Sequence, residues 1–461
     1  EVDISNWTKE TKLEYKFKIG VTSKEVDPNN IEPNMPKLDT NMIPVYYDET
    51  TETWKKADSS NENQEYKWYN YDEKMWANSV TVSETSRSKY LAANPGIGIP
   101  MEDILTMQVW VPRYKYKVWN YNADGTKTSN PQEIQITFEN ENNNASEIIC
   151  EDKIQGENGD GTSETCKLKA TNEVCTDEAC NNKTYTHPGF YNSEGFWIGK
   201  FELTGTINDI TVKPNLSSVR NQNVSSFRER IEEVTASSNK YGLTANTSHI
   251  ITNMEWGAVA YLSHSKYGTC TNGTCSEVKI NSSSSYITGG GSNAYNTTSG
   301  MLTSTTQNIY GVYDMSGGAW EYTMGNLMYK DGVTPMSGHS SNWNSGYTGR
   351  VYYDNSTDKN ATWQEYTGKE YPTIYIDKYS YSLGSKKATK LGDSVKEVYS
   401  DSSTGRAWYT DYNNFVTPAY PWFGRGGRLD SGSDAGVFAS INVMGNVNSG
   451  NSTRLIFTSL K

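Results

Sequence analysis

Residues 308–325 read Asn-Ile-Tyr-Gly-Val-Tyr-Asp-Met-Ser-Gly-Gly-Ala-Trp-Glu-Tyr-Thr-Met-Gly and constrain the architecture more than any other segment. Within it, Trp320 and Tyr322 flank Glu321. Because side chains alternate between the two faces of a strand, the two rings share one face and the carboxylate lies on the other. The segment therefore predicts a strand that carries one acidic side chain.

A second block lies further along the chain. Residues 421–438 read Pro-Trp-Phe-Gly-Arg-Gly-Gly-Arg-Leu-Asp-Ser-Gly-Ser-Asp-Ala-Gly-Val-Phe, and residues 451–457 read Asn-Ser-Thr-Arg-Leu-Ile-Phe. Residues 428–434 lack the alternation of a half-buried strand, and residues 439–444 are mixed in character. We expect exposed loops suited to contact with a ligand, with ordinary surface loops as the alternative.

Two earlier segments complete the pattern. Residues 196–204, Phe-Trp-Ile-Gly-Lys-Phe-Glu-Leu-Thr, predict a strand. Residues 252–261, Thr-Asn-Met-Glu-Trp-Gly-Ala-Val-Ala-Tyr, predict a helix from 254 to 264 with Asn253 as its cap. Ser226-Phe-Arg-Glu229 has the form of a capping box and predicts another short helix.

In their order along the chain, segments 196–204, 252–261, 308–325 and 421–457 resemble the motifs of the formylglycine-generating-enzyme (sulfatase-modifying factor) superfamily, across about residues 190–461. The resemblance implies a C-type-lectin-like fold with a small twisted sheet, two helices and long loops. In that family, the glutamate matching Glu321 and a neighbouring asparagine help to hold a structural cation, which implies Ca²⁺. Gly318 stands where the asparagine would be, so Glu321 is equally a candidate buried hydrogen-bond acceptor. The matching arginines, Arg425 and Arg454, are expected to pair inside the fold.

The resemblance favours a non-enzymatic branch of the superfamily. Its oxidases use a C-terminal cysteine pair as soft copper ligands, and no cysteine follows Cys275 here. Within that branch, the frame Arg425-Gly-Gly427, Ala435-Gly-Val-Phe438, Gly445 and Arg454-Leu-Ile-Phe457 resembles the variable proteins of diversity-generating retroelements. This implies a diversified closing segment that recognises ligands. The expected contact residues are Trp422, Arg428, Leu429, Asp430, Ser433, Asp434, Ser440, Asn442 and Met444.

Composition excludes several classes of protein. The 461 residues carry a net charge of −12, which argues against a general nucleic-acid binder and against docking on anionic lipid. No apolar stretch reaches the roughly 18 residues of a spanning helix. Aromatic residues make up 12% of the chain, which favours a folded protein. None of the four histidines lies in a metalloprotease or nucleophile-elbow motif, and no phosphate-binding loop occurs.

The cysteine pattern favours local disulfides over zinc, because the two C-x4-C pairs have no histidine partners nearby in sequence. Asn272-Gly273 lies at the centre of one pair, where a bridge would close a hairpin. Disulfides imply an oxidising, extracytoplasmic setting. The acidic segment 139–183 is expected to form a surface loop held by disulfides, with an acidic metal site as the alternative. The disulfide candidates are Cys150, Cys166, Cys175, Cys180, Cys270 and Cys275.

The predicted fold class is α+β, with a β-rich N-terminal region followed by the C-type-lectin-like domain. Residues 1–100 form the β-rich region, with strand-like runs at 15–19, 42–47 and 66–71. Residues 101–183 carry a strand pair, at 107–119 and 134–138, and the cysteine-stapled acidic loop. Residues 184–461 form the lectin-like domain.

We expect a non-enzymatic, ligand-binding protein of the bacterial cell surface, without a cofactor other than the implied Ca²⁺. Its partner would be a protein or glycan on another cell or host surface. Residues 43–47, 75–78, 109–116 and 187–190 resemble surface proteins of gut-type Firmicutes, many with a pilin-like N-terminal helix. Any membrane attachment would need an anchor outside this chain. The alternatives are a self-associating subunit of a pilus-like filament, a phage tail or decoration protein, and an enzyme that uses carboxylates.

Overall fold

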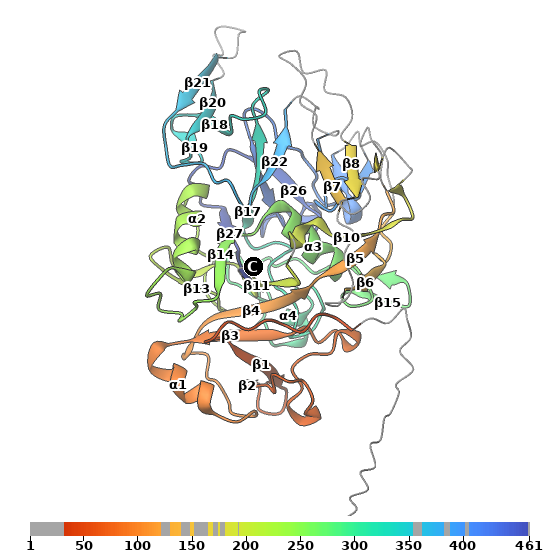
Figure 1. Cartoon of the computed structure of the whole chain (residues 1–461), viewed down its shortest axis with the longest axis vertical. Coiled ribbons are helices and arrows are strands. Elements are labelled where there is room, and N and C mark those ends of the chain that lie inside the picture. The colour runs from red at the N-terminus through yellow and green to blue at the C-terminus, as the bar shows by residue number, and fades with distance from the viewer. Residues whose placement is uncertain are drawn as a thin grey trace, which may run out of the picture.

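The computed structural model describes residues 32–120, 130–139, 148–151, 165–168, 174–175, 180–191, 193–353, 362–381, 388–401 and 405–459. It is rich in strands and has few helices, in line with the strand-heavy class predicted from sequence (Figure 1). The predicted strand at 15–19 lies outside the described residues. No helix in the described ranges has the length and apolar character needed to cross a membrane.

A sheet of seven described strands, which come from distant parts of the chain, forms the lower half of the molecule and runs through its middle (Figure 1). Its neighbouring strands pair antiparallel. It combines strands from all three predicted segments, so the boundaries near 100 and 183 do not separate sheets. In spatial order the strands are β14 (Asn246–Ile250), β28 (Leu455–Ser459), β11 (Gly195–Gly199), β4 (Ile104–Pro112), β3 (Asn78–Val82), β1 (Ile43–Asp48) and β2 (Thr53–Lys56).

The strand pair predicted at 107–119 and 134–138 is confirmed. β5 (Tyr114–Lys117) pairs with β6 (Ile136–Phe138) and with β10 (Thr184–Thr186). Tyr114 and Tyr116 are buried while the lysines between and after them are partly exposed, as the alternation predicts.

The aromatic run at 66–71 does not form a strand. The chain makes two 3-10 turns there, η1 (Gln64–Tyr66) and η2 (Tyr71–Glu73). Asn63 caps the first turn by accepting a hydrogen bond from the backbone N–H of Glu65. Asparagine side chains that bond the nearby backbone compete with strand pairing, which explains the difference.

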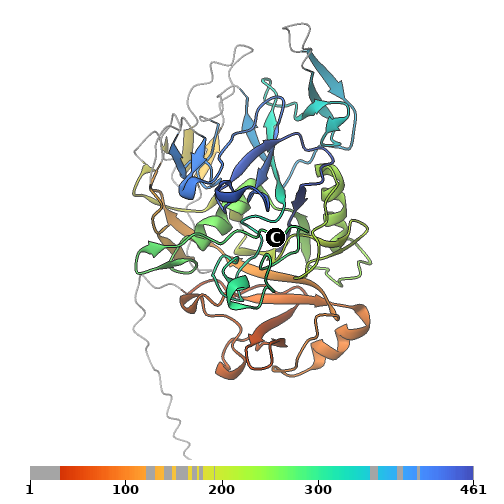
Figure 2. The same cartoon turned by 180° about the vertical axis from the view of Figure 1, so that it is seen from behind.

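A second sheet lies above the first and is built around the strand expected at residues 320–322. β17 (Trp320–Met328) is flanked by β22 (Asp377–Ser380), β25 (Trp422–Arg425) and β27 (Asn451–Thr453), and β26 (Ser440–Val443) pairs with β25. Next to it, β18 (Met336–Ser340), β19 (Trp343–Asn344), β20 (Gly349–Tyr353) and β21 (Thr362–Tyr366) form a smaller sheet. Seen from behind, these teal and blue strands lie above the orange N-terminal layer (Figure 2).

The helices are short, and the two expected ones begin elsewhere than predicted. α2 (Val224–Glu232) is capped by Asn223, whose side chain accepts from the N–H of Ser226, so Ser226 lies inside the helix. α3 (Asn253–Ser263) is capped by Thr252 in a capping box with Glu255. Every residue of α3 is buried, and the helix lies at the centre of the molecule (Figure 1).

The remaining elements are small. They are α1 (Glu84–Ala92), α4 (Thr298–Met301), β7 (Ile148–Glu151), β8 (Thr165–Leu168), β9 (Val174–Cys175), β12 (Thr204–Thr206), β13 (Asp209–Thr211), β15 (Cys270–Thr271), β16 (Thr274–Cys275), β23 (Tyr399–Asp401) and β24 (Arg406–Ala407), with 3-10 turns η4 (Pro188–Phe190), η5 (Glu233–Thr235), η6 (Trp408–Thr410) and η7 (Gly432–Asp434).

The predicted hairpin disulfide is present. Cys270 and Cys275 are directly opposite each other in the β15–β16 hairpin and form a disulfide. Asn272 and Gly273 both have positive φ, as a two-residue turn of this hand requires. Cys180 is also disulfide-bonded. The backbones of Cys150, Cys166 and Cys175 are cross-strand neighbours in β7, β8 and β9, and their sulfur atoms lie outside what the structure describes.

Candidate functional site

A pocket of about 450 Å³ opens beside β26, where three separate parts of the chain meet. Its size falls within the range of small-ligand sites. The start of β17, β19, the loop before β25, β26 itself and the loop that follows it all contribute. Its lining residues are Trp320, Trp343, Tyr420, Arg428, Ile441, Asn442, Val443, Met444, Asn446, Asn448 and Asn451.

Aromatic rings at this pocket are unusually exposed. Trp343 is 50% exposed and Tyr420 is 39% exposed, whereas Trp54, Trp76, Trp110, Trp197 and Trp256 are buried. Further aromatic rings lie next to those that line the pocket. His339 lies 6.0 Å from Trp343, 6.3 Å from Tyr420 and 5.9 Å from Tyr352, measured between ring centroids. We call His339, Trp343, Tyr352 and Tyr420 the aromatic strip.

Amide side chains supply the polar part of the pocket. The Asn442 Oδ1 accepts from Asn414 Nδ2 at 3.2 Å. The Asn448 Oδ1 accepts from the backbone N–H of Gly450 at 2.7 Å. These contacts hold the two amides in place, and the NH₂ groups of Asn442 and Asn448 have no partner among the described residues. The pocket thus combines apolar rings with fixed donors and acceptors.

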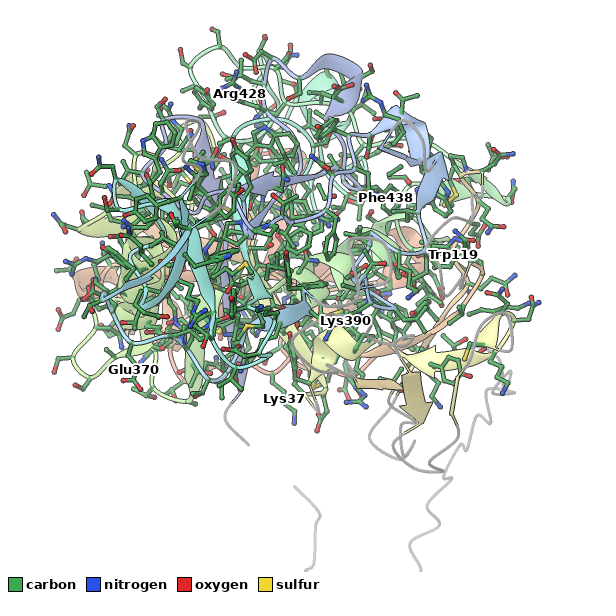
Figure 3. All side chains as sticks on the ribbon, turned by 90° about the horizontal axis from the view of Figure 1, so that it is seen from above. Lys37, Trp119, Glu370, Lys390, Arg428 and Phe438 are labelled. Atoms are coloured by element: carbon green, nitrogen blue, oxygen red, sulfur yellow. A yellow bond between two sulfur atoms is a disulfide. The ribbon has the colours of Figure 1, made fainter. Side chains whose placement is uncertain are left out.

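The pocket carries almost no net charge. Arg428 donates from Nε and Nη2 to the two carboxylate oxygens of Asp430, at 2.6 and 2.7 Å, which neutralises it. No aspartate, glutamate or lysine lies among the described lining residues. Figure 3 shows Arg428 at the edge of the molecule, on the side opposite Lys37.

Three of the predicted contact residues line the pocket, namely Arg428, Asn442 and Met444, and Asp430 reaches it through its ion pair with Arg428. Leu429 is partly exposed and its N–H donates to the Gly318 carbonyl. Ser433 and Asp434 lie in η7 on the same loop, outside the pocket lining. Asp434 forms an ion pair with Arg406.

Two predicted contacts need correction. Trp422 is fully buried and its ring stacks on Tyr347 with a centroid distance of 5.8 Å. Ser440 is also fully buried, and its hydroxyl donates to Asn413 Oδ1 at 3.1 Å. Both side chains therefore support the pocket from below. Both faces of β25 are covered, so alternation within that strand gives no exposed side.

Trp343 was missed because it lies far from the predicted segment, whereas Tyr420 directly precedes it. Trp343 sits in Ser340-Ser341-Asn342-Trp343-Asn344-Ser345-Gly346, a turn-forming stretch with a single large ring. A lone tryptophan in such a polar loop has few apolar neighbours in sequence to pack against. That pattern could have indicated an exposed contact residue.

The buried residues around Glu321 do not fit the implied Ca²⁺. Glu321 accepts from Arg454 on both carboxylate oxygens, at 2.5 and 3.0 Å, and both side chains are fully buried. The guanidinium thus occupies the place of a cation. Burial raises the pKa of Glu321 to about 7, against the opposing effect of Arg454. A Cβ at Gly318 would lie 2.3 Å from Glu202 Oε1, so an asparagine is not accommodated there.

Arg425 and Arg454, the two arginines that match the family motifs, both make contacts inside the fold. Arg454 also donates to the carbonyls of Gly199 and Tyr313. Arg425 is fully buried and donates to the Ser394 carbonyl at 3.2 Å and to its hydroxyl. These contacts bear out the expected structural role.

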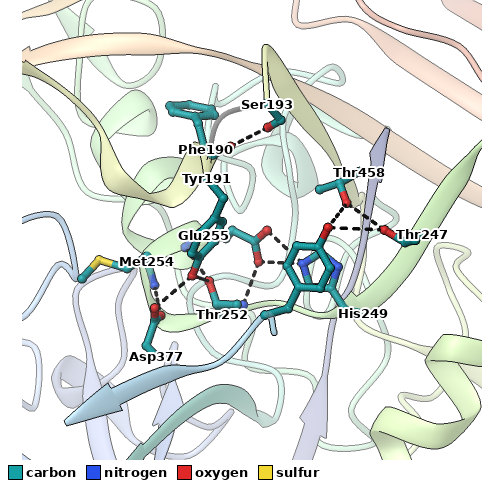
Figure 4. Close-up of polar contacts among 11 residues, drawn as sticks. Phe190, Tyr191, Ser193, Thr247, His249, Thr252, Met254, Glu255, Asp377 and Thr458 are labelled. Atoms are coloured by element: carbon teal, nitrogen blue, oxygen red, sulfur yellow. Dashed lines mark hydrogen bonds and ion pairs between the residues drawn. The ribbon is translucent and has the colours of Figure 1, made fainter. Parts of the chain in front are cut away.

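A polar cluster at the start of α3 looks like catalytic machinery but caps the helix (Figure 4). His249 Nε2 lies 2.9 Å from Glu255 Oε1, and the Glu255 Oε2 accepts from the N–H of Thr252. Asp377 Oδ2 accepts from the N–H of Met254, and Tyr191 donates to Asp377 Oδ1. These carboxylates satisfy free backbone donors of the helix N-terminus.

Among the described residues, His249 has no hydroxyl or thiol hydrogen-bond partner. The Nδ1 of His249 is buried without a hydrogen-bond partner among the described residues, and the Tyr375 ring stacks on the imidazole at 3.8 Å. A serine-type triad requires a hydroxyl on the second nitrogen. Within the described ranges, no serine, threonine or cysteine contacts either nitrogen of His249.

Two other features of the described residues are weaker candidates for a functional site. In the described part of the chain, one set of three residues has metal-ligand spacing, namely His264, Cys270 and Cys275. Its two sulfurs are joined in the disulfide and are therefore not thiolate ligands. A hollow of about 800 Å³ in the N-terminal layer is lined by charged side chains that include the ion pair of Asp48 and Lys55.

No family model and no curated protein matches the chain. Among solved structures, the chain is similar to the "Major Tropism Determinant U1 Variant", at 12% sequence identity and a TM-score of 0.22. The match covers 75% of this chain and 87% of that one. A TM-score this low does not establish a shared fold.

Proposed function

We propose that this chain is a ligand-binding protein displayed on a bacterial cell surface, with the pocket beside β26 as its binding site. The observation that carries the proposal is the exposure of Trp343 and Tyr420 around a concave site. Exposed rings that adjoin a pocket are typical of recognition surfaces, since they offer large contact area at low entropic cost. The mode of action is recognition rather than catalysis.

The finer proposal is that the closing segment is a diversified contact face. Its support is the contrast between frame and loops. Arg425, Phe438 and Arg454 are fully buried, while residues 428–434 are partly or fully exposed. Substitutions in the loop would therefore change contacts without disturbing the core. The partner would be a protein or glycan on another cell or host surface.

Binding to intact cells tests the proposal directly. Fluorescently labelled full chain would be incubated with a panel of epithelial and bacterial cells and measured by flow cytometry. We expect Trp343→Ala and Tyr420→Ala to reduce binding, and Leu91→Ala in α1 to leave it unchanged, because Leu91 is exposed in the N-terminal layer. Equal binding by all variants would overturn the proposed site. Absence of cell binding together with filaments in electron micrographs would favour a structural subunit.

Sequencing the locus across a natural population tests the diversified face. We expect substitutions concentrated at residues 428–434 and 439–444, with Arg425 and Arg454 constant. An even, low substitution rate would exclude diversification and leave a fixed-ligand protein.

A further inference from the structure

We infer that the pocket beside β26 binds a neutral carbohydrate. The inference rests on the proposed function and specifies its ligand class. It follows from the charge of the pocket, from the pairing of rings with amides, and from the continuation of the aromatic strip beyond the pocket.

The charge of the pocket favours an uncharged ligand. Arg428 is the charged lining residue among those described, and its guanidinium already holds both carboxylate oxygens of Asp430. An acidic ligand would have to compete with Asp430. A cationic ligand would find no carboxylate on the lining.

The side chains match the two chemical faces of a sugar. A pyranose ring presents C–H groups on its faces and hydroxyls around its edge. Trp320, Trp343 and Tyr420 offer apolar rings for the face. A hydroxyl both donates and accepts, and an amide side chain does the same, so asparagines suit the edge. The pocket has four: Asn442, Asn446, Asn448 and Asn451.

The aromatic strip extends this chemistry beyond one sugar unit. His339 packs between Trp343 and Tyr420, and Tyr352 follows it on β20. Trp363 continues the row at 5.2 Å from Tyr352. A terminal sugar in the pocket would therefore leave the next units of an oligosaccharide over partly exposed rings.

The backbone between the lining residues Met444 and Asn446 is tightly packed, which suits a ligand with little apolar surface. Gly445 has φ +79°, and a Cβ there would lie 2.6 Å from the Trp422 ring. The backbone after β26 is thus pressed against a buried tryptophan that itself stacks on Tyr347. Preorganised sites lose less conformational entropy on binding, so fixed amides can hold a weakly apolar ligand.

An array of neutral and acidic glycans, probed with the purified full chain, tests the inference. We expect binding to neutral glycans, with the affinity measured by calorimetry on a soluble neutral oligosaccharide that binds. Trp343→Ala should weaken that affinity about tenfold or more, the effect of losing one ring contact. Trp343→Tyr should restore part of it, and Leu91→Ala should have no effect. Melting temperatures verify that each variant folds.

The outcomes separate the inference from the proposed function. Binding confined to acidic glycans, or no glycan binding at all, would overturn the inference. Treating the cells with periodate, which cleaves vicinal diols, should abolish the cell binding described above. If cell binding persists after periodate and still depends on Trp343, the ligand is a protein, and only the carbohydrate inference fails. If Trp343→Ala changes neither glycan nor cell binding, both fail.

Discussion

Arg454 donates from Nε and Nη2 to the two carboxylate oxygens of Glu321, and both side chains are inaccessible to solvent. Glu321 belongs to β17 of the upper sheet, whereas Arg454 directly precedes β28 of the seven-stranded sheet. The ion pair therefore joins the two sheets between residues far apart in sequence.

Removing one partner of this pair should be strongly destabilising. Glu321→Gln leaves the Arg454 guanidinium buried without its counter-charge, a change that typically costs about 3–5 kcal/mol of unfolding free energy. The exposed pair of Arg230 and Glu233 offers a matched control, and Glu233→Gln should cost less than about 1 kcal/mol. Urea denaturation monitored by tryptophan fluorescence measures both. A Glu321→Gln variant as stable as the control would contradict this role.

The pH dependence of stability should include a contribution from Glu397. Burial, reinforced by Asp393, raises the pKa of Glu397 to about 7 from 4.5, although Tyr116 and Tyr261 donate hydrogen bonds to it. The folded state therefore binds a proton that the unfolded state releases between pH 4.5 and 7. Stability from this group is complete below pH 4.5 and is lost as the pH rises through 7, by up to about 3 kcal/mol.

The variant Glu397→Gln isolates this effect. Its carboxamide does not titrate, so the stability of the wild-type chain relative to the variant should be greatest below pH 4.5, fall as the pH rises to about 7, and change little above that. Other buried acids titrate in both proteins and cancel in the difference. Guanidinium denaturation at several pH values provides the measurement, and a difference independent of pH would refute the assignment.

Gly257 should not tolerate alanine, although it lies inside a helix. A Cβ at this position of α3 would lie 1.8 Å from the carbonyl oxygen of Gly392. The clash should cost about 1–3 kcal/mol, more than the roughly 1 kcal/mol that alanine gains in helix propensity. At Gly98 no atom lies within 4 Å of a Cβ, so Gly98→Ala should be nearly neutral. Equal melting temperatures for the two variants would count against the close approach.

The disulfide between Cys270 and Cys275 should stabilise the chain modestly, because it closes a short loop. Replacing both cysteines by alanine should lower the unfolding free energy by about 2 kcal/mol, measured without reductant so that other disulfides stay intact. Ligand binding at the pocket should be retained. An unchanged denaturation midpoint would show that the β15–β16 hairpin is held by its other contacts.

Local patterns predicted the local elements well. Alternation identified β5 and β6, and the Asn-Gly turn identified the β15–β16 hairpin. Helix starts were less accurate, because Asn223 and Ser226 are both competent caps and tertiary packing selects between them. The 66–71 run failed because asparagine bonds to the backbone outweighed strand propensity.

The site was only partly predictable, for a physical reason. Arg428, Asn442 and Met444 share one segment, so the sequence placed them together. Tyr420 directly precedes the same segment, whereas Trp343 belongs to β19 of the smaller sheet and joins them only through tertiary packing, which no local pattern records. Whether Trp422 points to solvent depends on what covers β25, which is also a tertiary property.

The position of β28 has a consequence for how the protein is made. Residues 455–459 form a strand between β14 and β11, both of which lie more than 200 residues earlier in the chain. A growing polypeptide that has not yet reached them leaves those two strands without their shared neighbour. The sheet can therefore be completed only after residues 455–459 have been made and have reached β14 and β11.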